Sequence, residues 1–267
     1  MLEDKNSWEA VGYEVESGQL QKEQKVVIYR PPENSPNPIY NIYKGQDLII
    51  TEVFSDREAE FDWIAESIRK DIEVEGVAPE QIVVICLDTS KFKNYLPSIQ
   101  KRLFEYNIAS TIPGLIEEAS AFAESGRVTL STVFRAKGNE ACIVYIVSFD
   151  SLYDYIEEIG NRNRAFTSIT RSKAWVRITG TGKNMEEVKK EIDCILADIP
   201  RFKFDFPDMD RIRRLGSETN RKRKKRERLE KIATEISNAD LKEIASLNPA
   251  ILDQMSRLVD EARRENQ

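Results

Sequence analysis

Apolar residues recur with two different spacings along the chain, and the spacing predicts where strands and helices lie. Residues 24–30 alternate between apolar and polar positions, as in a strand with one buried face. Residues 82–87 are apolar without alternation, which is typical of a strand buried on both faces of a parallel sheet. Residues 128–134 and 143–149 are interpreted as strands of the same buried type. Two further strands are predicted at residues 47–54 and 175–179.

Helical spacing separates these strands. Ser55 is followed three positions later by Glu58, which is a capping-box pattern. The apolar face of the helix after this cap consists of Phe61, Ile64, Ala65, Ile68 and Ile72. A second helical stripe consists of Phe92, Leu96, Ile99 and Leu103. Further helices are predicted near residues 152–159 and 164–173, and from a cap at Asn184 to Leu196. Because strands and helices alternate, we predict an α/β fold in three layers, with a parallel sheet between helices.

The pattern changes at Pro207. Beyond this residue, high charge and helical periodicity replace the strand patterns. We therefore predict three regions. Residues 1–50 form an N-terminal connecting segment with a short strand pair, residues 51–206 form the α/β domain, and residues 207–267 form a charged helical tail.

The absence of histidine from the whole chain narrows the possible chemistry. It excludes a histidine general acid or base, a Ser-His-Asp triad and most catalytic zinc sites. The cysteines are Cys86, Cys142 and Cys194, which are far apart and have no metal-ligand spacing. We interpret them as buried thiols and predict no metal site.

Charge is distributed unevenly. The net charge is −6, yet residues 211–231 hold eleven Lys or Arg against three Glu, so the remainder carries −14. The cluster around Arg221, Lys222 and Arg223 is a candidate phosphate-binding surface with salt-dependent affinity. A solvated helix paired with its own glutamates and the acidic body is an equally good interpretation.

Two features predict the compartment. The apolar run at residues 141–149 is far shorter than the roughly 20 residues that cross a bilayer. The N-terminus, MLEDKNSWEA, is acidic and lacks the apolar core of a signal peptide. We therefore expect a cytoplasmic protein without a membrane partner.

Two segments combine charged residues with glycine or threonine beside predicted strands. The first, STVFRAKGNEACIVYIV at residues 131–147, has a turn between two strands. This turn contains Arg135, Lys137, Gly138 and Glu140. The second, RAFTSITRSKAW at residues 164–175, places Thr170, Arg171 and Lys173 where a helix runs into a strand.

Together the two segments resemble motifs V and VI of superfamily 1 helicases of the UvrD/Rep type. The residues that match motif V are Thr132, Ala136, Lys137, Gly138 and Glu140. The residues that match motif VI are Phe166, Thr167, Ile169, Thr170, Arg171, Ser172 and Lys173. Residues 82–108 look like motif IV, so the resemblance spans roughly residues 51–180.

The resemblance implies the second RecA-like motor domain, of the P-loop NTPase type, from an ATP-dependent DNA or RNA helicase. In such a domain Arg171 would be the catalytic arginine finger, while Gly138, Glu140 and Thr170 would also contact the nucleotide. A guanidinium that another domain supplies to a phosphoryl group couples the chemistry to domain closure. The predicted contacts to single-stranded nucleic acid within these motifs are Thr132, Phe134, Arg135 and Lys137.

The sequence departs from the family pattern at two places. The histidine usual in motif V is Phe134 here, so its polar contacts are lost, and an aromatic ring could stack on a base instead. The tyrosine and arginine usual in motif IV are Leu87 and Asp88, which removes a phosphate-binding arginine. Lys91 or Lys93 is a candidate replacement.

A phosphate-binding loop is missing. The pattern G-x-x-x-x-G-K-[ST] is most nearly matched by RITGTGKN, which has Arg177 for the first glycine and Asn184 for the final hydroxyl residue. An acidic pair at the end of a buried strand is absent as well. We therefore expect ATP with Mg²⁺ to be bound mainly by an N-terminal RecA-like domain, in the same full-length chain or a separate subunit. Alone, this chain is expected to lack ATPase activity.

Simpler interpretations remain open for the same residues. Arg171 at a helix C-terminus could serve only the helix dipole, and Glu140 and Lys137 could be ordinary turn residues. Phe134 follows an apolar strand, so core packing is as good an interpretation as base stacking. The whole chain could also be a non-catalytic interaction module, or a nucleic-acid-binding module, that retains the fold.

Overall fold

The computed structural model describes residues 5–34, 39–43, 45–115, 122–155 and 159–208. Apart from Pro207 and Asp208, the predicted helical tail lies outside the described residues, and so do Arg221, Lys222 and Arg223. In the part that is described, none of the helices combines the length and apolarity needed to span a bilayer.

A parallel sheet of six strands dominates the described residues. The strands lie in the order β3-β8-β7-β4-β6-β5, and every neighbouring pair is parallel. Their bounds are β3 (Ile49–Phe54), β4 (Ile82–Cys86), β5 (Ser110–Thr111), β6 (Val128–Thr132), β7 (Ala141–Val147) and β8 (Ser172–Thr181). Each strand predicted for this domain is therefore present, and the predicted parallel sheet is confirmed.

The register of the strands defines two edges of this sheet. Cys86 at the end of β4 lies beside Thr132 and Val147, so we call this end the carboxyl edge. Ala141 at the start of β7 lies beside Ser172 at the start of β8, and we call this end the amino edge.

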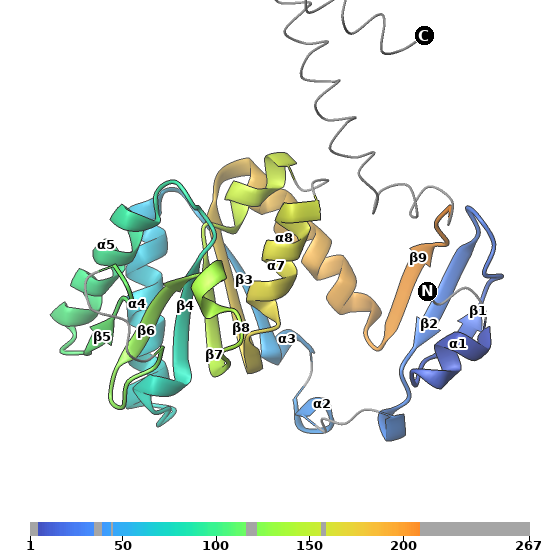
Figure 1. The fold of residues 1–267 in the computed structure, drawn as a ribbon, viewed down its shortest axis with the longest axis horizontal. Helices are drawn as coiled ribbons and strands as arrows, with labels where there is room; N and C mark the ends of the chain where they lie inside the picture. Colours follow the sequence, from blue (N-terminus) through green and yellow to red (C-terminus); the bar gives the residue numbers. More distant parts are fainter. Residues whose placement is uncertain (1–4, 35–38, 44, 116–121, 156–158, 209–267) are drawn as a thin grey trace, which may run out of the picture. The chain divides into compact units, whose positions relative to one another are not determined.

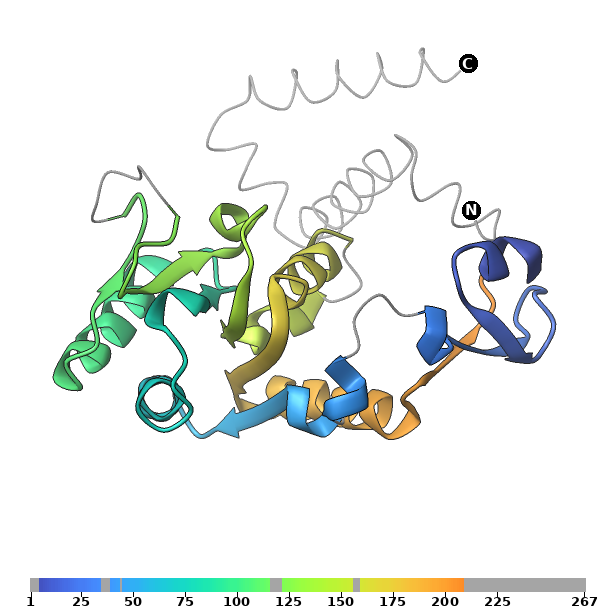
Figure 2. The same cartoon turned by 90° about the horizontal axis from the view of Figure 1, so that it is seen from below.

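Helices cover both faces of the sheet (Figures 1 and 2). The helices on the first face are α4 (Arg57–Glu73) and α5 (Phe92–Glu105). The second face is covered by α6 (Val133–Ala136), η3 (Phe149–Tyr155), α7 (Ile159–Ile169) and α8 (Gly182–Asp198). The predicted three-layer α/β fold is therefore confirmed.

Two apolar cores hold these layers together. Along β4, Val84 packs in the core under α4 and α5, whereas Val83 and Ile85 pack in the core on the opposite face. Both faces of this strand are buried, which explains why its sequence is apolar without alternation. The predicted stripe on α5 is confirmed by the burial of Leu96, Ile99 and Leu103.

The remaining elements are short. The chain begins with α1 (Lys5–Ala10), β1 (Glu14–Ser17), β2 (Lys25–Tyr29), η1 (Pro32–Asn34), α2 (Ile39–Ile42) and α3 (Gly45–Leu48). The others are η2 (Pro79–Gln81) and β9 (Arg201–Asp205). A small second sheet has the order β1-β2-β9, in which β1 and β2 are antiparallel. The sequence predicted β2, whereas β1 and β9 were missed.

The described residues form two compact units. The larger contains the described residues between 5 and 17 and between 27 and 203, and the smaller contains residues 18–26 and 204–208. Within the smaller unit, the amide of Glu23 donates to the carbonyl of Phe206 (2.9 Å), and the amide of Phe206 donates to the carbonyl of Gln24 (2.8 Å).

Several predicted boundaries are wrong. The helix cap before α4 is Asp56, whose carboxylate accepts a hydrogen bond from the amide of Ala59 (2.9 Å), whereas Ser55 only donates to Asp56. Strand β6 ends at Thr132, because the next residues turn into α6. Helix α8 begins after Thr181 and not at Asn184.

The prediction of three buried thiols is also only partly right. Cys86 is buried, Cys142 is half-buried and Cys194 is exposed. Burial raises the pKa of the Cys86 thiol to about 12, so this thiol stays protonated at neutral pH and is chemically inert.

Gly180 in β8 permits a close approach between side chains on the second face. A methyl group at this position would lie 2.4 Å from Oδ1 of Asp150 and 2.8 Å from the sulfur of Met185. Glycine is therefore required here by space, because the Asp150 carboxylate packs directly over the backbone of β8.

We predict that Gly180→Ala lowers the free energy of unfolding by about 1–3 kcal/mol, because the added methyl group overpacks a tight site. Urea denaturation would measure the change. Gly160→Ala on α7 is the matched control, since in the described part of the chain its added methyl group meets no atom within 4 Å outside its chain neighbours and its own helix backbone. The control is expected to be neutral or to gain up to about 1 kcal/mol from helix propensity. Equal stability of both variants would contradict the close packing at Gly180.

Candidate functional site

The two predicted motifs meet at the amino edge of the sheet. Glu140 immediately precedes β7, Arg171 immediately precedes β8, and the first residues of these two strands are paired. The amide of Ala141 donates to the carbonyl of Arg171 (3.0 Å), which fixes the two segments at the backbone level. The candidate nucleotide-binding residues Glu140 and Arg171 therefore share one edge, although they are 31 positions apart in the sequence.

Arg171 is half-buried and is held by neutral oxygen atoms. Its Nε donates to the carbonyl of Thr167 (3.1 Å), one turn back in α7. Its Nη1 donates to the carbonyl of Asn139 (3.5 Å), and its Nη2 donates to the hydroxyl of Thr170 (3.4 Å). The two Nη contacts are long and therefore weak. Nε anchors the side chain while the end of the guanidinium keeps donor capacity.

Thr170 has a local role in this structure. Its hydroxyl donates to the carbonyl of Phe166 (2.9 Å), so it satisfies the last turn of α7. Gly138 occupies a left-handed conformation with φ of +88°, which a residue with a side chain rarely adopts. No atom would crowd a methyl group there, so the backbone conformation and not space requires glycine.

The motif between β6 and β7 crosses the sheet from one edge to the other. Thr132 lies at the carboxyl edge, whereas Glu140 lies at the amino edge. The predicted site residues therefore form two groups. Thr132 stands apart from Glu140, Thr170 and Arg171, as expected if nucleic acid and nucleotide were contacted at different edges.

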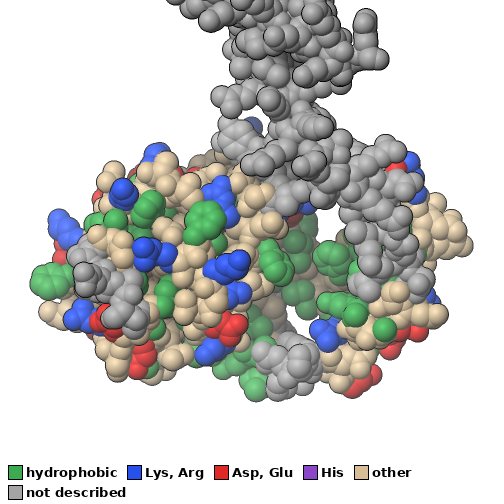
Figure 3. Space-filling view, viewed as in Figure 1, with side chains coloured by type: hydrophobic (Ala, Val, Ile, Leu, Met, Phe, Trp, Pro, Cys, Tyr) green, Lys and Arg blue, Asp and Glu red, His purple; other side chains and the backbone are tan. Residues whose placement is uncertain are grey.

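The phenylalanines of the two motifs are exposed to solvent. Phe134 on α6 and Phe166 on α7 are each 69% exposed, so the core-packing interpretation of Phe134 is wrong. Apolar and basic side chains lie among one another on the face shown in Figure 3. Lys137 is exposed as well.

Arg135 is not a freely extended side chain. Its guanidinium packs on Gly114, because a methyl group added to Gly114 would lie only 2.0 Å from Nη1. The arginine is exposed but held against the segment that follows β5, which restricts the positions that its charge can reach.

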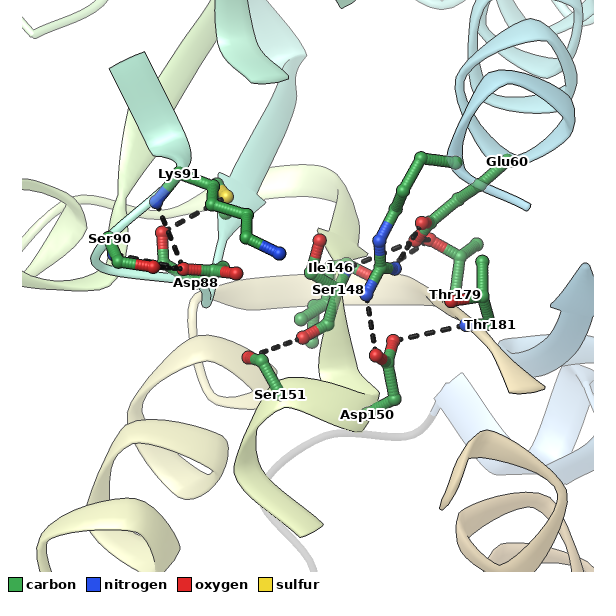
Figure 4. A network of polar contacts seen from close by, with 12 residues as sticks. Glu60, Asp88, Ser90, Lys91, Ile146, Ser148, Asp150, Ser151, Thr179 and Thr181 are labelled. Atoms are coloured by element: carbon green, nitrogen blue, oxygen red, sulfur yellow. Dashed lines mark hydrogen bonds and ion pairs between the residues drawn. The ribbon is translucent and has the colours of Figure 1, made fainter. Parts of the chain in front are cut away.

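A buried polar network lies at the carboxyl edge (Figure 4). Glu60 on α4 is 0% exposed. Its Oε1 accepts hydrogen bonds from the amide of Ser148 (3.0 Å) and the hydroxyl of Thr179 (2.7 Å), and its Oε2 forms an ion pair with Arg57 (2.5 Å). Arg57 also pairs with Asp150, whose other oxygen accepts from the amide of Thr181 (3.0 Å).

This network joins α4 to the ends of β7 and β8. Burial acts to lower the pKa of Arg57, but its hydrogen bond to Asp150 and the charge of Glu60 outweigh burial and raise that pKa. The guanidinium therefore stays charged between two carboxylates. Removing one member of such a buried set costs about 3–5 kcal/mol, because the remaining charge is left without a partner.

The turn after β4 is organised by Asp88. Its Oδ1 accepts from the amides of Ser90 (2.9 Å) and Lys91 (3.0 Å). Burial acts to raise the pKa of Asp88, but these hydrogen bonds and that of the Ser90 hydroxyl outweigh burial and lower it. Arg164 of α7 reaches the same place, where its Nη1 donates to the carbonyl of Leu87 (3.3 Å).

Sequence reasoning missed Arg57, Glu60, Asp150 and Arg164. Glu60 had a detectable signal, since it directly precedes Phe61 and lies one turn before Ile64 on the apolar face of its helix. A charged residue on such a face requires a buried partner. Its cation, Arg57, is only three positions away, but its other donors, the Ser148 amide and the Thr179 hydroxyl, are 88 and 119 positions away and could not be identified from the sequence.

A surface hollow of about 430 Å³ lies between η3, α7 and α8. It is lined mainly by apolar side chains, including Phe149, Ile169 and Ile192. Ile169 also matches motif VI, but none of the candidate nucleotide-binding or nucleic-acid-binding residues is among those that line the hollow. The hollow and the candidate site are therefore separate features.

A family model identifies the segment that contains both motifs. Residues 127–179 match the UvrD-like helicase C-terminal domain. The resemblance is confirmed for this segment. The match begins at Arg127, just before β6, and ends within β8, so it covers both motifs and the paired strand starts.

Comparisons with solved structures and with curated proteins give weaker or no matches. A solved structure, described as the C-terminal domain of a possible DNA helicase from Lactobacillus plantarum WCFS1, is similar at 17% identity with a TM-score of 0.36. The similarity covers 51% of this chain and 73% of that one. Comparison with curated proteins gives no match.

The backbone conformation of Ser148, at the carboxyl edge, can be tested for strain. This residue has φ of +59°, and its buried Oγ has no hydrogen-bond partner among the described residues. We predict that Ser148→Gly raises the free energy of unfolding by about 1 kcal/mol, because glycine tolerates this conformation. Ser148→Ala keeps the strained backbone and is the control. Thermal and urea denaturation of both would be compared, and an alanine variant at least as stable as the glycine variant would contradict the strain.

Proposed function

We propose that this chain is the C-terminal motor half of a superfamily 1 ATP-dependent DNA or RNA helicase. In this role it supplies an arginine finger and part of the track for a single strand. The observation that carries the proposal is the pairing of Ala141 with Ser172, which joins the ends of the two motifs at one edge. This edge would close over ATP and Mg²⁺ held by an N-terminal RecA-like domain.

Arg171 is the proposed catalytic residue. Phosphoryl transfer is catalysed mainly by positioned positive charge, so a guanidinium at the closing edge of a second domain is well suited to it. The long contacts of Nη1 and Nη2 are easily exchanged for phosphate oxygens, while the bond from Nε to Thr167 keeps the side chain oriented. Glu140, directly beside it, would contact the nucleotide.

The carboxyl edge is proposed as the nucleic-acid side. Thr132 ends β6 there, and the exposed Phe134 and Lys137 follow on the connecting segment. Exposed aromatic rings among basic side chains suit a single strand, because bases stack on the rings while the cations contact phosphates. ATP hydrolysis at one edge would then be coupled through the domain to movement of the strand at the other.

A non-catalytic interaction module is the alternative. The contact of Arg171 with the carbonyl of Thr167 favours it, because a cation at a helix C-terminus stabilises the helix without any ligand. Under this alternative, the chain would bind partners equally well without its arginine.

We predict that the chain alone releases no phosphate from ATP. Its sequence lacks the phosphate-binding loop and the acidic pair that would bind the triphosphate and Mg²⁺. Addition of an N-terminal motor domain that carries a phosphate-binding loop should produce ATPase activity. Arg171→Ala should then reduce the turnover number by about 10³-fold or more. Phosphate release under saturating ATP would measure both effects.

The control for this experiment is Lys190→Ala, which removes an exposed cation that pairs with Glu187 on α8. It should leave the ATPase unchanged. Assembly of the two domains should be measured for every variant. If the domains associate normally but Arg171→Ala retains full ATPase activity, the proposed arginine finger is wrong and the adaptor alternative is favoured.

A further inference from the structure

The segments that follow two neighbouring strands of the sheet, β4 and β7, go to opposite faces of the sheet. β4 and β7 are neighbours, yet the chain leaves β4 into α5 on the first face and leaves β7 through η3 and α7 on the second. At such a point the loops diverge from the carboxyl ends of the two strands, and ligands of open α/β sheets bind there. We call this place the β4/β7 crevice.

The cations around this crevice differ in how far their charge is neutralised. Arg57 lies between Glu60 and Asp150, so its charge is fully compensated. Arg164 donates to the carbonyl of Leu87 (3.3 Å) and to the side-chain oxygen of Asn161, and both acceptors are neutral. Among the described residues, Arg164 forms no ion pair with a carboxylate.

Arg164 is also held in place before any ligand arrives. Asn161, its side-chain partner, is only 6% exposed, and the carbonyl of Leu87 belongs to the end of β4. Two of the five N–H donors of a guanidinium suffice for these contacts, so others stay available. A fixed and partly unused guanidinium fork matches the geometry of a phosphate group.

Lys91 adds a second positive charge at the same place. In Figure 4 its side chain extends from the turn at Asp88 toward the carboxyl end of β7, where Ser148 lies. Its backbone amide is used by Asp88, but its ammonium has no carboxylate partner within the part of the chain that is described. Apart from the compensated set of Arg57, Glu60 and Asp150, the crevice therefore has two cations, Arg164 and Lys91, and the carboxylate of Asp88.

We propose that Arg164, assisted by Lys91, binds a backbone phosphate of a single-stranded nucleic acid at the β4/β7 crevice. This inference rests on the proposed function and names a contact residue for its nucleic-acid side. Leu87 and Asp88, which follow β4, carry no positive charge. Arg164 of α7, on the second face of the sheet, places a positive charge beside them. The side chain of Asp88 is occupied by the turn.

This placement gives α7 two functions. The helix runs from the end of β7 back to the start of β8, antiparallel to both strands. Arg164 and Arg171 are seven positions apart on this segment, which is about 10 Å along a helix axis. α7 would thus carry a phosphate contact for the strand and would position the finger for the nucleotide, which follows two residues after the helix ends at Ile169.

Binding of a fluorescent oligothymidine to the full chain tests the proposal. The affinity would be measured by anisotropy over a range of salt concentrations for the unaltered chain, Arg164→Gln, Arg164→Lys and Lys91→Gln. Removal of one phosphate contact should lower the slope of log K against log salt by about 0.7. We expect this loss for Arg164→Gln and Lys91→Gln, whereas Arg164→Lys should keep the slope and bind more weakly.

Lys70→Gln on α4 is the matched control, because this exposed lysine pairs with Glu66 on its own helix. Its slope should not change. Thermal unfolding of each variant distinguishes a purely structural role of Arg164, which links α7 to β4, from a role in phosphate binding. If Arg164→Gln lowers the melting temperature but leaves the slope intact, Arg164 is only a tether between α7 and β4, and the proposal is wrong.

The outcome is distinct from that of the ATPase experiment. An unchanged slope for Arg164→Gln, together with loss of partner-dependent ATPase in Arg171→Ala, overturns the phosphate contact and leaves the proposed motor function intact. A lowered slope without any partner-dependent ATPase of the unaltered chain supports the contact and instead contradicts the proposed motor function.

Discussion

The parallel pairing of β7 with β8 is the constraint on which the candidate site depends. Glu140 and Arg171 belong to distant segments, and only this pairing places them at a common edge. The backbone hydrogen bond between Ala141 and Arg171 makes their proximity independent of side-chain conformation. Each of the two residues directly precedes a strand held in the core on both sides. The positions of the two backbones are therefore set by two paired strands in the interior of the sheet.

The opposite ends of the same two strands are fixed by a different kind of interaction. Glu60 is buried completely, and a buried carboxylate is tolerated only when donors surround it. Its donors come from β7, β8 and α4 itself, so the network ties three elements to one charge. Apolar packing of α4 on the sheet is non-directional, whereas these hydrogen bonds have a required geometry. The polar contacts select one arrangement of the carboxyl edge.

The sequence predicted the parallel sheet and the motif residues well, because local patterns encode both. It failed where two neighbouring residues could serve the same purpose or where a contact was remote. Ser55 and Asp56 can each cap a helix, and only the structure distinguishes them. Val133 and Phe134 have strand-forming side chains, yet the chain must leave β6 there to cross to the amino edge. The contacts of Arg57 with Asp150 and of Arg164 with the carbonyl of Leu87 are tertiary, so no local pattern contains them.

The two exposed phenylalanines have a thermodynamic consequence for any assembly that this chain enters. Phe134 and Phe166 present most of their rings to water. A fully buried aromatic side chain removes about 150–250 Å² from solvent, and such burial makes the heat capacity change of association negative. A complex that covers these rings would show this signature in calorimetry, whereas one that leaves them in water would owe its stability to charge and would weaken as salt is added.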